Sequence, residues 1–577
     1  MCKDLKGCKA PPLMRVKVKG PDGRDTFVTQ PELVDEAAIA AWEPIHAGNV
    51  SANTEKLLFR NLLASFGEHA VKREPQALTP ITGTQVADGI AKAPDSTCGL
   101  DGVRKGDLAS LSPLGCEWLA SMFNCIEAGA QWPQQSLCGR LVFLAKGGND
   151  FNPLDYRKIS ILSKCYRLHM SIRLRDVCPW VASWAMDCLF AGTNAPSGAE
   201  DAWYETALEV ELAKLINACL TGGGADIYKC FDQISLILLG LMLTHGGFPP
   251  QLWHAYYAFH SNVVYHNSVA GMLGRPHRHP MSIPQGCPFS MTFIAFMLVP
   301  WARSMLSVGC IPRALADDIL ITAKGDQHEL LFLRGYTLTL LYFHIIGARI
   351  AITKCFLFST CTATRARLQN HVWPIINCSI TVVLHYRDLG AHICLGNRMV
   401  APTLRDRLVA GHGICQKLAN TGWEYSSRHR ASHTLVLPLS LYGCEASPFP
   451  LAEMGKLVTS VARNIGPYSH LSSNTMAFLT ASAGNLDPIE EVLYRRVAML
   501  RRMLCKHSKL AELVSTIYDI YEKAGMFGTN ACHGDLSQLQ PAPPPGGGSH
   551  DAWTCSSIKV CGPIGPLLQQ LHDFAWA

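Results

Sequence analysis

Two acidic segments of the chain carry the residues best suited to chemistry. The first, ADIYKCFDQI, begins at Ala225 and places Asp226 directly after a glycine-rich run. The second, ALADDILI, sets Asp317 and Asp318 side by side among apolar residues. Adjacent carboxylates in an apolar setting are costly unless a cation neutralises them. Oxygen ligands of this kind suit Mg²⁺, and two such ions about 4 Å apart would assist an in-line phosphoryl transfer.

Each acidic segment also has a simpler explanation. Asp317 and Asp318 would form an exposed turn, and Asp226 would only end a strand, with no metal involved. A short motif on its own has a high false-positive rate, so both interpretations stay open for either segment alone. The apolar residues 319–321 that follow the acidic pair argue against a solvated turn.

A third segment, IPQGCPFS, lies between the two acidic ones and precedes an apolar run. Its Pro and Gly residues predict a loop that opens a buried helix. Gln285 can hydrogen-bond a base or a sugar, and Gly286 would let the backbone approach a ligand closely. The alternative is a simple junction between a loop and a core helix.

The segments around these motifs predict the elements that hold them. From about residue 110 to 395, apolar runs broken by Gly and Pro mix helical and strand patterns, which predicts an α+β or α/β body. From about 396 to 510 the pattern is helical. Its clearest helix begins at Asp487, a suitable N-cap, with Pro488 in the first helical position.

Composition bounds the class of protein. The 577 residues include 51 Lys and Arg against 45 Asp and Glu, a net charge of +6, and 48% are hydrophobic. This excludes wholesale disorder and permits, without requiring, a nucleic-acid partner. The 23 cysteines show no CxxC spacing, so we expect reduced thiols in an intracellular protein. The N-terminus lacks the apolar region of a signal peptide, and His344 and Arg349 interrupt the run 336–352, so no membrane span is expected.

The order of the motifs resembles that of the reverse transcriptases of non-LTR (LINE-like) retrotransposons. The resemblance extends from about Leu141 to Gly390 and, more loosely, to about residue 505. Any one motif alone would be weak, whereas seven in one order are specific. The segments are VFLAKGGNDFNPLDYRKIS, ADIYKCFDQI, IPQGCPFSM, ALADDILI, GARIAITKCFLF, YRDLGAHI and LPLSLYGCEAS.

The resemblance implies a catalytic role for four residues. Asp226, Asp317 and Asp318 take the positions of the family's metal-binding aspartates, which hold two Mg²⁺ ions, or Mn²⁺ in their place. Lys354 takes the position of a lysine that is a candidate general acid for the departing pyrophosphate. The implied enzyme class is a nucleotidyltransferase, specifically an RNA-directed DNA polymerase.

Five further residues take positions that bind the incoming nucleotide. Arg157 and Lys146 match basic residues that contact the triphosphate. Phe231 falls where an aromatic ring crowds a ribose 2′-hydroxyl and so favours dNTPs. Gln285 and Gly286 would line the nucleotide and the template-facing pocket. The alternatives are surface charge for the basic residues and core packing for Phe231.

Four arginines lie on the helix predicted from Pro488 to Leu504. The resemblance places this region in a thumb that grips the template–primer duplex, where arginines would meet phosphates and binding would weaken with salt. The alternative is a solvated basic helix face. The four are Arg495, Arg496, Arg501 and Arg502.

The sequence departs from the family pattern at several positions. Lys158 replaces the usual Pro after Arg157, Leu315 replaces an aromatic residue, and Met291 replaces a Pro. The run Thr221-Gly222-Gly223-Gly224 has poor strand propensity where a firm strand is expected. These departures bear on the rate and the shape of the nucleotide pocket more than on the reaction class, and they also fit an element copy that has lost its activity.

The expected architecture is an α+β right-hand polymerase with fingers, an antiparallel-sheet palm and a helical thumb. We expect a partly helical N-terminal extension over 1–114 and fingers and palm over 115–395. A thumb-like helical region would cover 396–510, and a low-complexity linker and tail 511–577.

The expected reaction is DNA synthesis on an RNA template, in which a primer 3′-hydroxyl attacks the α-phosphate of a dNTP. The expected partners are an RNA template, a DNA primer and dNTPs, without a membrane. A nuclear location is expected from the family, since the chain has no clear targeting signal. Two alternatives stay open: a catalytically inactive remnant that only binds RNA, and an RNA-dependent RNA polymerase.

Overall fold

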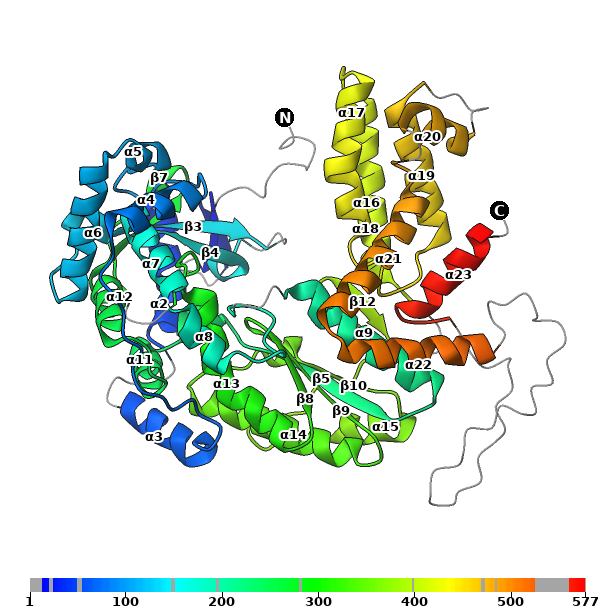
Figure 1. Cartoon of the computed structure of the whole chain (residues 1–577), viewed down its shortest axis with the longest axis horizontal. Coiled ribbons are helices and arrows are strands. Elements are labelled where there is room, and N and C mark those ends of the chain that lie inside the picture. Colours follow the sequence, from blue (N-terminus) through cyan, green and yellow to red (C-terminus); the bar gives the residue numbers. More distant parts are fainter. Residues whose placement is uncertain are drawn as a thin grey trace.

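The computed structural model describes residues 13–19, 24–48, 54–146, 151–193, 197–279, 283–396, 399–467, 473–482, 485–524 and 560–575. Over these residues the prediction of an α+β fold is confirmed, since helices predominate around four small sheets (Figure 1). Within the same ranges no helix combines the length and the apolar character needed to cross a membrane. Within the predicted linker and tail over 511–577, residues 525–559 lie outside the described residues.

A four-stranded antiparallel sheet carries both acidic segments, and we call it the acid-bearing sheet. Its strands lie in the order β10–β5–β9–β8. Strands β5 and β9 pair so that Asp226 faces Asp318, while Ala316 and Asp317 form the turn between β8 and β9. The strands are β5 (Leu220–Asp226), β8 (Ile311–Leu315), β9 (Asp318–Lys324) and β10 (Phe356–Ser359).

Strand β5 forms despite its three consecutive glycines. Rings of the edge strand β10 fill the space that side chains would take. A Cβ on Gly222 would lie 2.4 Å from the ring of Phe358, and one on Gly224 would lie 2.5 Å from that of Phe356. Since β5 also pairs with a strand on each side, its backbone groups are satisfied. Low intrinsic strand propensity is thus overcome by packing across the strand pair.

Helices cover the acid-bearing sheet (Figure 1). α14 packs against β5 and β9, and α13 and α9 pack against β8. The prediction that the IPQGCPFS segment opens a buried helix is confirmed, because α13 begins at Ser290 and is buried along most of its length. These helices are α9 (Ala199–Leu215), α13 (Ser290–Ser307) and α14 (His328–Ile345).

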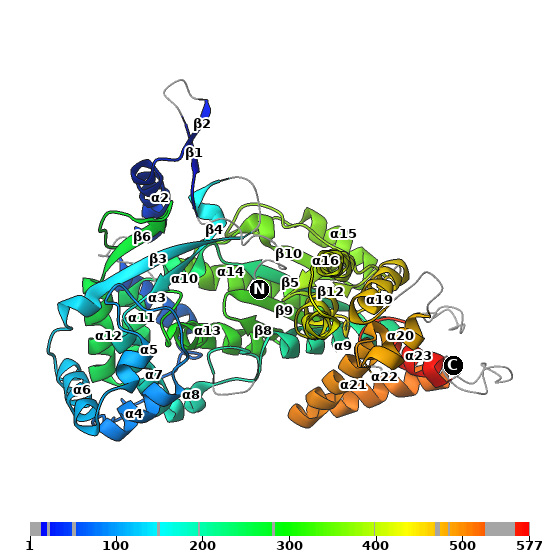
Figure 2. The ribbon, with the colours of Figure 1, turned by 90° about the horizontal axis from the view of Figure 1, so that it is seen from above.

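A second sheet, β4–β3–β6–β7, lies with the N-terminal helices (Figure 2). Strand β3 pairs antiparallel with β4 and parallel with β6. Val34 and Trp42, from the predicted extension, belong to the same buried cluster as Leu141 and Phe143. The N-terminal residues are therefore part of this body, and the predicted boundary at 114/115 falls inside a helix, α6 (Pro113–Glu127).

This N-terminal body combines short strands with runs of consecutive helices. Two 3-10 turns flank β3 and β4, at Gln134–Leu137 and Pro153–Asp155. The strands are β1 (Val16–Lys19), β2 (Asp25–Val28), β3 (Cys138–Ala145), β4 (Tyr156–Ile161), β6 (Val264–Val269) and β7 (Met272–Leu273). Besides α6, the helices are α2 (Pro31–His46), α3 (Glu55–Phe66), α4 (Gly83–Lys92), α5 (Lys105–Ala109), α7 (Lys164–Asp176), α8 (Cys178–Trp184), α10 (Cys230–Gln233), α11 (Leu236–His245) and α12 (Pro250–Asn262).

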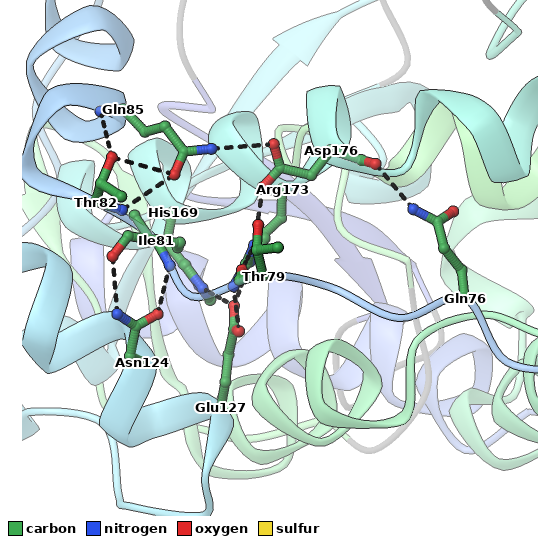
Figure 3. A network of polar contacts seen from close by, with 10 residues as sticks. All are labelled: Gln76, Thr79, Ile81, Thr82, Gln85, Asn124, Glu127, His169, Arg173 and Asp176. Atoms are coloured by element: carbon green, nitrogen blue, oxygen red, sulfur yellow. Dashed lines mark hydrogen bonds and ion pairs between the residues drawn. The ribbon is translucent and has the colours of Figure 1, made fainter.

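A buried polar network ties the segment before α4 to α6 and α7 (Figure 3). The Glu127 carboxylate accepts two hydrogen bonds of 2.6 Å from Arg173 and lies 2.7 Å from His169 Nε2. Arg173 also donates to Thr79 O at 2.9 Å and to Asp176 at 2.8 Å. Burial raises the pKa of Glu127, but the hydrogen bonds from His169 and Arg173 outweigh it and hold that pKa below its usual value.

The predicted helical region has a hydrophobic core of its own. α21 begins at Pro488 as predicted, and the Asp487 side chain caps it by accepting from Ile489 N at 2.8 Å. A short hairpin, β11 (His385–Asp388) and β12 (Ala391–Cys394), precedes the region. The remaining elements are the 3-10 turn Ile352–Lys354, α15 (Thr362–Asn370), α16 (Pro402–Ala419), α17 (Tyr425–Ala431), the π-helical turn Ser432–Val436, α18 (Leu437–Leu441), α19 (Leu451–Ile465), α20 (Asn474–Ser482) and α21 (Pro488–Lys506).

Two further helices, α22 (Lys509–Lys523) and α23 (Ile564–Ala575), lie where a linker and tail were predicted, and the boundary at 510/511 falls inside α22. Glu211 of α9 anchors them. Its carboxylate accepts from Ile564 N at 2.9 Å, Gly565 N at 2.7 Å and the Tyr521 hydroxyl at 3.1 Å. Burial raises the pKa of Glu211 from 4.5 to about 8, although these hydrogen bonds favour the ionised form.

The Glu127→Ala substitution leaves the buried Arg173 guanidinium without its main carboxylate. We expect the free energy of unfolding to fall by about 3–5 kcal/mol, because breaking one side of a buried pair strands the other charge. Thermal unfolding and amide hydrogen exchange over α4 and α7 measure the effect. The matched control is Glu117→Ala, on the exposed side of α6, which should change stability by less than about 0.5 kcal/mol. Equal stability of the two variants would contradict the assignment.

Glu211 makes stability depend on pH. Because its folded-state pKa is raised, its contribution to stability is complete below pH 4.5 and is lost as the pH rises to about 8. In that window it lowers the free energy of unfolding by up to about 1.4 kcal/mol per pH unit. In Glu211→Gln this slope should disappear, whereas Glu522→Gln, exposed on α22, should keep it. Unfolding midpoints between pH 5 and 9 decide the point, and parallel curves for all three proteins would refute it.

Candidate active site

The two acidic segments meet at one end of the acid-bearing sheet. Asp226 ends β5 and Asp318 begins β9, and the two are direct partners across the strand pair. Partner Cα atoms in antiparallel strands lie about 4.5–5.5 Å apart. Asp317 occupies the adjoining turn after Ala316, whose φ of 56° is left-handed. That conformation costs a non-glycine residue about 1–2 kcal/mol, so the turn stores strain beside the carboxylates.

Negative charge accumulates at this end of the sheet. Partial burial, and then the charges of Asp317 and Asp226, raise the pKa of Asp318 to about 6. Burial also raises the pKa of Asp317, and the Asp226 charge adds to the effect. Burial, together with neighbouring negative charge, therefore makes Asp317 and Asp318 harder to ionise, and a bound cation would favour their ionised forms.

Three predicted basic residues surround the carboxylates. Lys354 Nζ lies 3.4 Å from Asp226 Oδ1, and its side chain is 58% exposed. Lys146 and Arg157 belong to the β3–β4 hairpin, and their charges lower the pKa of Asp317. Burial, and then the neighbouring charges of Lys354 and Arg157, lower the pKa of Lys146. The structure thus brings all three into electrostatic reach of the carboxylates.

A pocket of about 260 Å³ opens beside Asp226, Asp318 and Lys354. Its wall includes Arg387 and Asp388 of the β11–β12 hairpin, to which the sequence analysis gave no role. Burial raises the pKa of Asp388 to about 7, and its Oδ2 has no hydrogen-bond partner among the described residues. Arg387 and Asp388 belong to the YRDLGAHI motif, which the sequence analysis had identified. Their position beside the acidic residues depends on the tertiary fold and could not be predicted from the motif.

The carboxylates do not by themselves complete a metal cage. Within the described part of the chain, no three His, Cys, Asp or Glu side chains are gathered closely enough to hold a metal ion. Mg²⁺, however, is usually held by one or two carboxylates together with substrate phosphates and water. Asp226 and Asp318 provide such a pair, and the pKa of Asp318 is raised by burial and then by neighbouring negative charge, which a cation would offset. The donor set therefore suits Mg²⁺ shared with a nucleotide.

Gly286 has a structural reason to be glycine. Its φ is 139°, and a Cβ there would lie 2.1 Å from the carbonyl oxygen of Ser160 in β4. Gln285 O accepts from Ser160 N at 2.8 Å, so the loop is pinned to that strand. The glycine is thus required by a close approach to protein, and a close approach to a ligand at Gly286 stays a prediction. The Gln285 side chain is half-buried.

Phe231 lies on α10, the short helix after Asp226, and is half-buried against the main core. Its carbonyl oxygen accepts from Ile283 N at 2.8 Å, which joins α10 to the loop before α13. The next residue, Asp232, is buried and pairs with Lys158 Nζ at 2.8 Å. Core packing and a role beside a nucleotide are both compatible with this position.

Lys158, a departure from the family pattern, is 3% exposed and links α10 to α2. Its ammonium contacts His46 Nε2 and lies 4.5 Å from the ring centre of Trp42. Lys229 lies at the same distance from that ring. Side chains alternate along β4, so Arg157 is exposed while Lys158 is buried. Lys158 therefore departs from the family pattern because it forms a buried ion pair with Asp232. The residue type alone does not predict that partner.

Arg496 is not available to nucleic acid. Its guanidinium is 3% exposed and donates to Cys444 O, Ser447 O and Pro566 O at 3.0–3.2 Å. The prediction that it meets phosphates is wrong, because it joins α21 to α23 and to the segment after α18. The acceptors of Arg496 lie far from it in the sequence. The spacing of arginines along α21 therefore could not predict that Arg496 is buried and links these segments.

The other three arginines of α21 differ from one another. Arg495 pairs with Glu491 at 2.8 Å on the same helix, and Arg502 pairs with Glu200 of α9 at 2.7 Å. Arg501 is exposed. Of the four predicted phosphate ligands, Arg501 therefore has the position that best fits the role, and Arg502 would first have to leave Glu200.

Comparison with known proteins adds no assignment: the chain matches no protein-family model and no curated protein.

The Asp232→Ala substitution isolates the buried Lys158 ammonium. We expect a loss of about 3–5 kcal/mol in the free energy of unfolding. The double variant Lys158→Met/Asp232→Leu should recover most of it, because apolar residues of similar size often replace a buried pair at little cost. Asp88→Ala, exposed on α4, is the control. If the single and double variants unfold at the same temperature, the pair does not hold α10 to β4.

Proposed function

We propose that the protein is an RNA-directed DNA polymerase that transfers nucleotides from dNTPs to a primer 3′-hydroxyl. The observation that carries the proposal is the direct pairing of Asp226 with Asp318, with Asp317 in the adjoining turn. Two distant motifs are brought together there, with Asp317 in the turn next to the Asp226–Asp318 pair and basic side chains nearby, and this supports what the resemblance to non-LTR reverse transcriptases implies. In this proposal the acid-bearing sheet is the palm of a right-hand polymerase.

The surrounding elements support the same assignment. The β3–β4 hairpin, with Lys146 and Arg157, would be part of the fingers, and the bundle α16–α21 would be the thumb. Lys146 and Arg157 lie within electrostatic reach of Asp317, so a triphosphate between them would be neutralised from one side. The pocket beside Asp226 and Asp318 leaves room for reacting groups.

Each residue then has a physical task. Bound Mg²⁺ would stabilise the charge that develops on the attacking and departing oxygens. Asp226 and Asp318, with Asp317 in the adjoining turn, would hold it through their carboxylates, and Arg157 would orient the triphosphate. Lys354, which is exposed beside Asp226, would give a proton to the departing pyrophosphate. Catalysis of this kind consists mainly of positioning and charge stabilisation.

The Asp317→Asn and Asp226→Asn substitutions test the proposal directly. We expect each to reduce dNTP incorporation on an RNA template with a DNA primer by at least about 100-fold, since each removes charge that stabilises the transition state. Primer extension in Mg²⁺, repeated in Mn²⁺, measures the rate. The control is Asp519→Asn, exposed on α22, which should retain wild-type activity.

The assay also separates the alternatives. Faster extension with NTPs than with dNTPs would indicate an RNA-dependent RNA polymerase. No incorporation with either ion, together with salt-sensitive RNA binding that both Asp variants retain, would indicate an inactive remnant. Either result would overturn the proposal, as would equal incorporation by wild type and both Asp variants.

A further inference from the structure

Two cysteines flank the paired ends of β5 and β10, at the end of the acid-bearing sheet that is opposite Asp226: Cys219 precedes β5, and Cys361 lies just beyond β10. The β5–β10 register pairs Thr221 with Ser359. One further backbone hydrogen bond extends this pairing, from Thr360 N to Leu220 O at 2.9 Å, and the Leu220 amide donates to the Thr360 hydroxyl at 2.9 Å. If the register continued by one more step, it would set Cys219 opposite Cys361.

Opposed residues in an antiparallel pair have Cα atoms about 4.5–5.5 Å apart. Disulfides span Cα separations of about 4.4–6.8 Å, so this position needs little backbone movement to form one. Both thiols are free and half-buried, which leaves them open to a small reagent. Burial raises the pKa of the Cys219 thiol and the charge of Cys361 raises it further, as expected for two side chains that lie close together.

The surroundings make the two thiols unequal. Cys361 is the residue that precedes α15, and the backbone amides of Thr364 and Ala363 in its first turn lower its pKa despite some burial. Burial raises the pKa of Cys219, and the charge of Cys361 adds to that effect. A helix N-terminus favours the thiolate, which is the nucleophilic form of cysteine. One thiol is therefore suited to attack and its neighbour to stay protonated.

Most other described thiols lack this combination. Burial raises the pKa of Cys230 and Cys444 well above the usual value. Cys125 and Cys505 are exposed and serve as internal references for reagent access. A reactive thiol beside a second, resolving thiol is the arrangement found in peroxide-sensing proteins.

We propose that Cys219 and Cys361 form a hydroperoxide-reactive dithiol site that closes into a disulfide across β5 and β10. The Cys361 thiolate attacks one oxygen of hydrogen peroxide, the O–O bond breaks, and hydroxide leaves. Cys361 is then a sulfenic acid. The Cys219 sulfur attacks it, the S–S bond forms, the S–O bond breaks, and water leaves with the Cys219 proton. Two thiols lose two electrons and two protons, and the peroxide is reduced to two water molecules.

The disulfide would join β5, which ends at Asp226, to its neighbouring strand β10. β5 ends at Asp226, and β10 follows the turn that carries Lys354. A cross-link at their far end would restrain the edge strand β10 against the central strand. The site stands on its own geometry, so it does not depend on the proposed polymerase activity.

The test uses the full-length protein, equimolar hydrogen peroxide and mass spectrometry of peptides after thiol blocking. We expect a cross-linked peptide pair containing Cys219 and Cys361, reversed by dithiothreitol, and a rise of several degrees in the unfolding midpoint. Cys361→Ser should abolish the cross-link and keep the fold, because Ser is a favoured residue at a helix N-terminus. Cys219→Ala should give a dimedone adduct at Cys361 without the cross-link.

The reference variant is Cys505→Ser, which should form the Cys219–Cys361 cross-link as wild type does. Wild-type protein that yields no such peptide pair would overturn the proposal. So would peroxide oxidation of Cys125 and Cys505 that outpaces oxidation of Cys361, or a dimedone adduct on Cys219 in place of Cys361. Because wild type alone can give these results, poor folding of a variant would not rescue the proposal.

Discussion

The antiparallel pairing of β5 and β9 is the constraint on which the candidate site depends. It forces Asp226 and Asp318 to face each other and leaves Asp317 in the turn beside them. Such an arrangement opposes folding, because like charges are brought together and the strained turn at Ala316 must be held. Strand pairing and the core beneath the sheet have to supply the free energy that holds it. Once this free-energy cost is met, negative charge is concentrated at a position where it could bind a cation together with the phosphates of a nucleotide.

Buried ion pairs and hydrogen bonds, placed away from this end of the sheet, connect the parts of the body. Lys158 and Asp232 join β4 to α10, and Arg173 and Glu127 join α7 to α6. Glu211 joins α9 to the start of α23. Each pair consists of groups that are expensive to bury alone, so each favours one relative placement of its elements over others. The contacts of Glu211 explain why part of the region predicted as a tail is built into the body.

The sequence predicted those features that depend on interactions between residues close together in the chain. The α+β class, the buried helix α13 and the start of α21 at Pro488 follow from nearby residues, and the structure confirms them. Arg496 shows where this reasoning stops, since one of its acceptors, Pro566, belongs to a helix that begins far along the chain. Gly286 shows the same limit, because the atom that excludes a side chain there belongs to Ser160. In both cases the residue type indicated a special role. The contact responsible for that role is made by a residue distant in the sequence and therefore depends on tertiary packing.

The glycines of β5 and the phenylalanines of β10 behave as one unit. Because the Phe358 and Phe356 rings stand where side chains on Gly222 and Gly224 would stand, neither strand can change alone without a clash or a void. Substitutions at these positions would have to be paired, with a larger residue on one strand matched by a smaller residue on the other. Related chains should therefore show compensating side-chain volumes at these two residue pairs. A comparison of each position by itself would not detect this dependence.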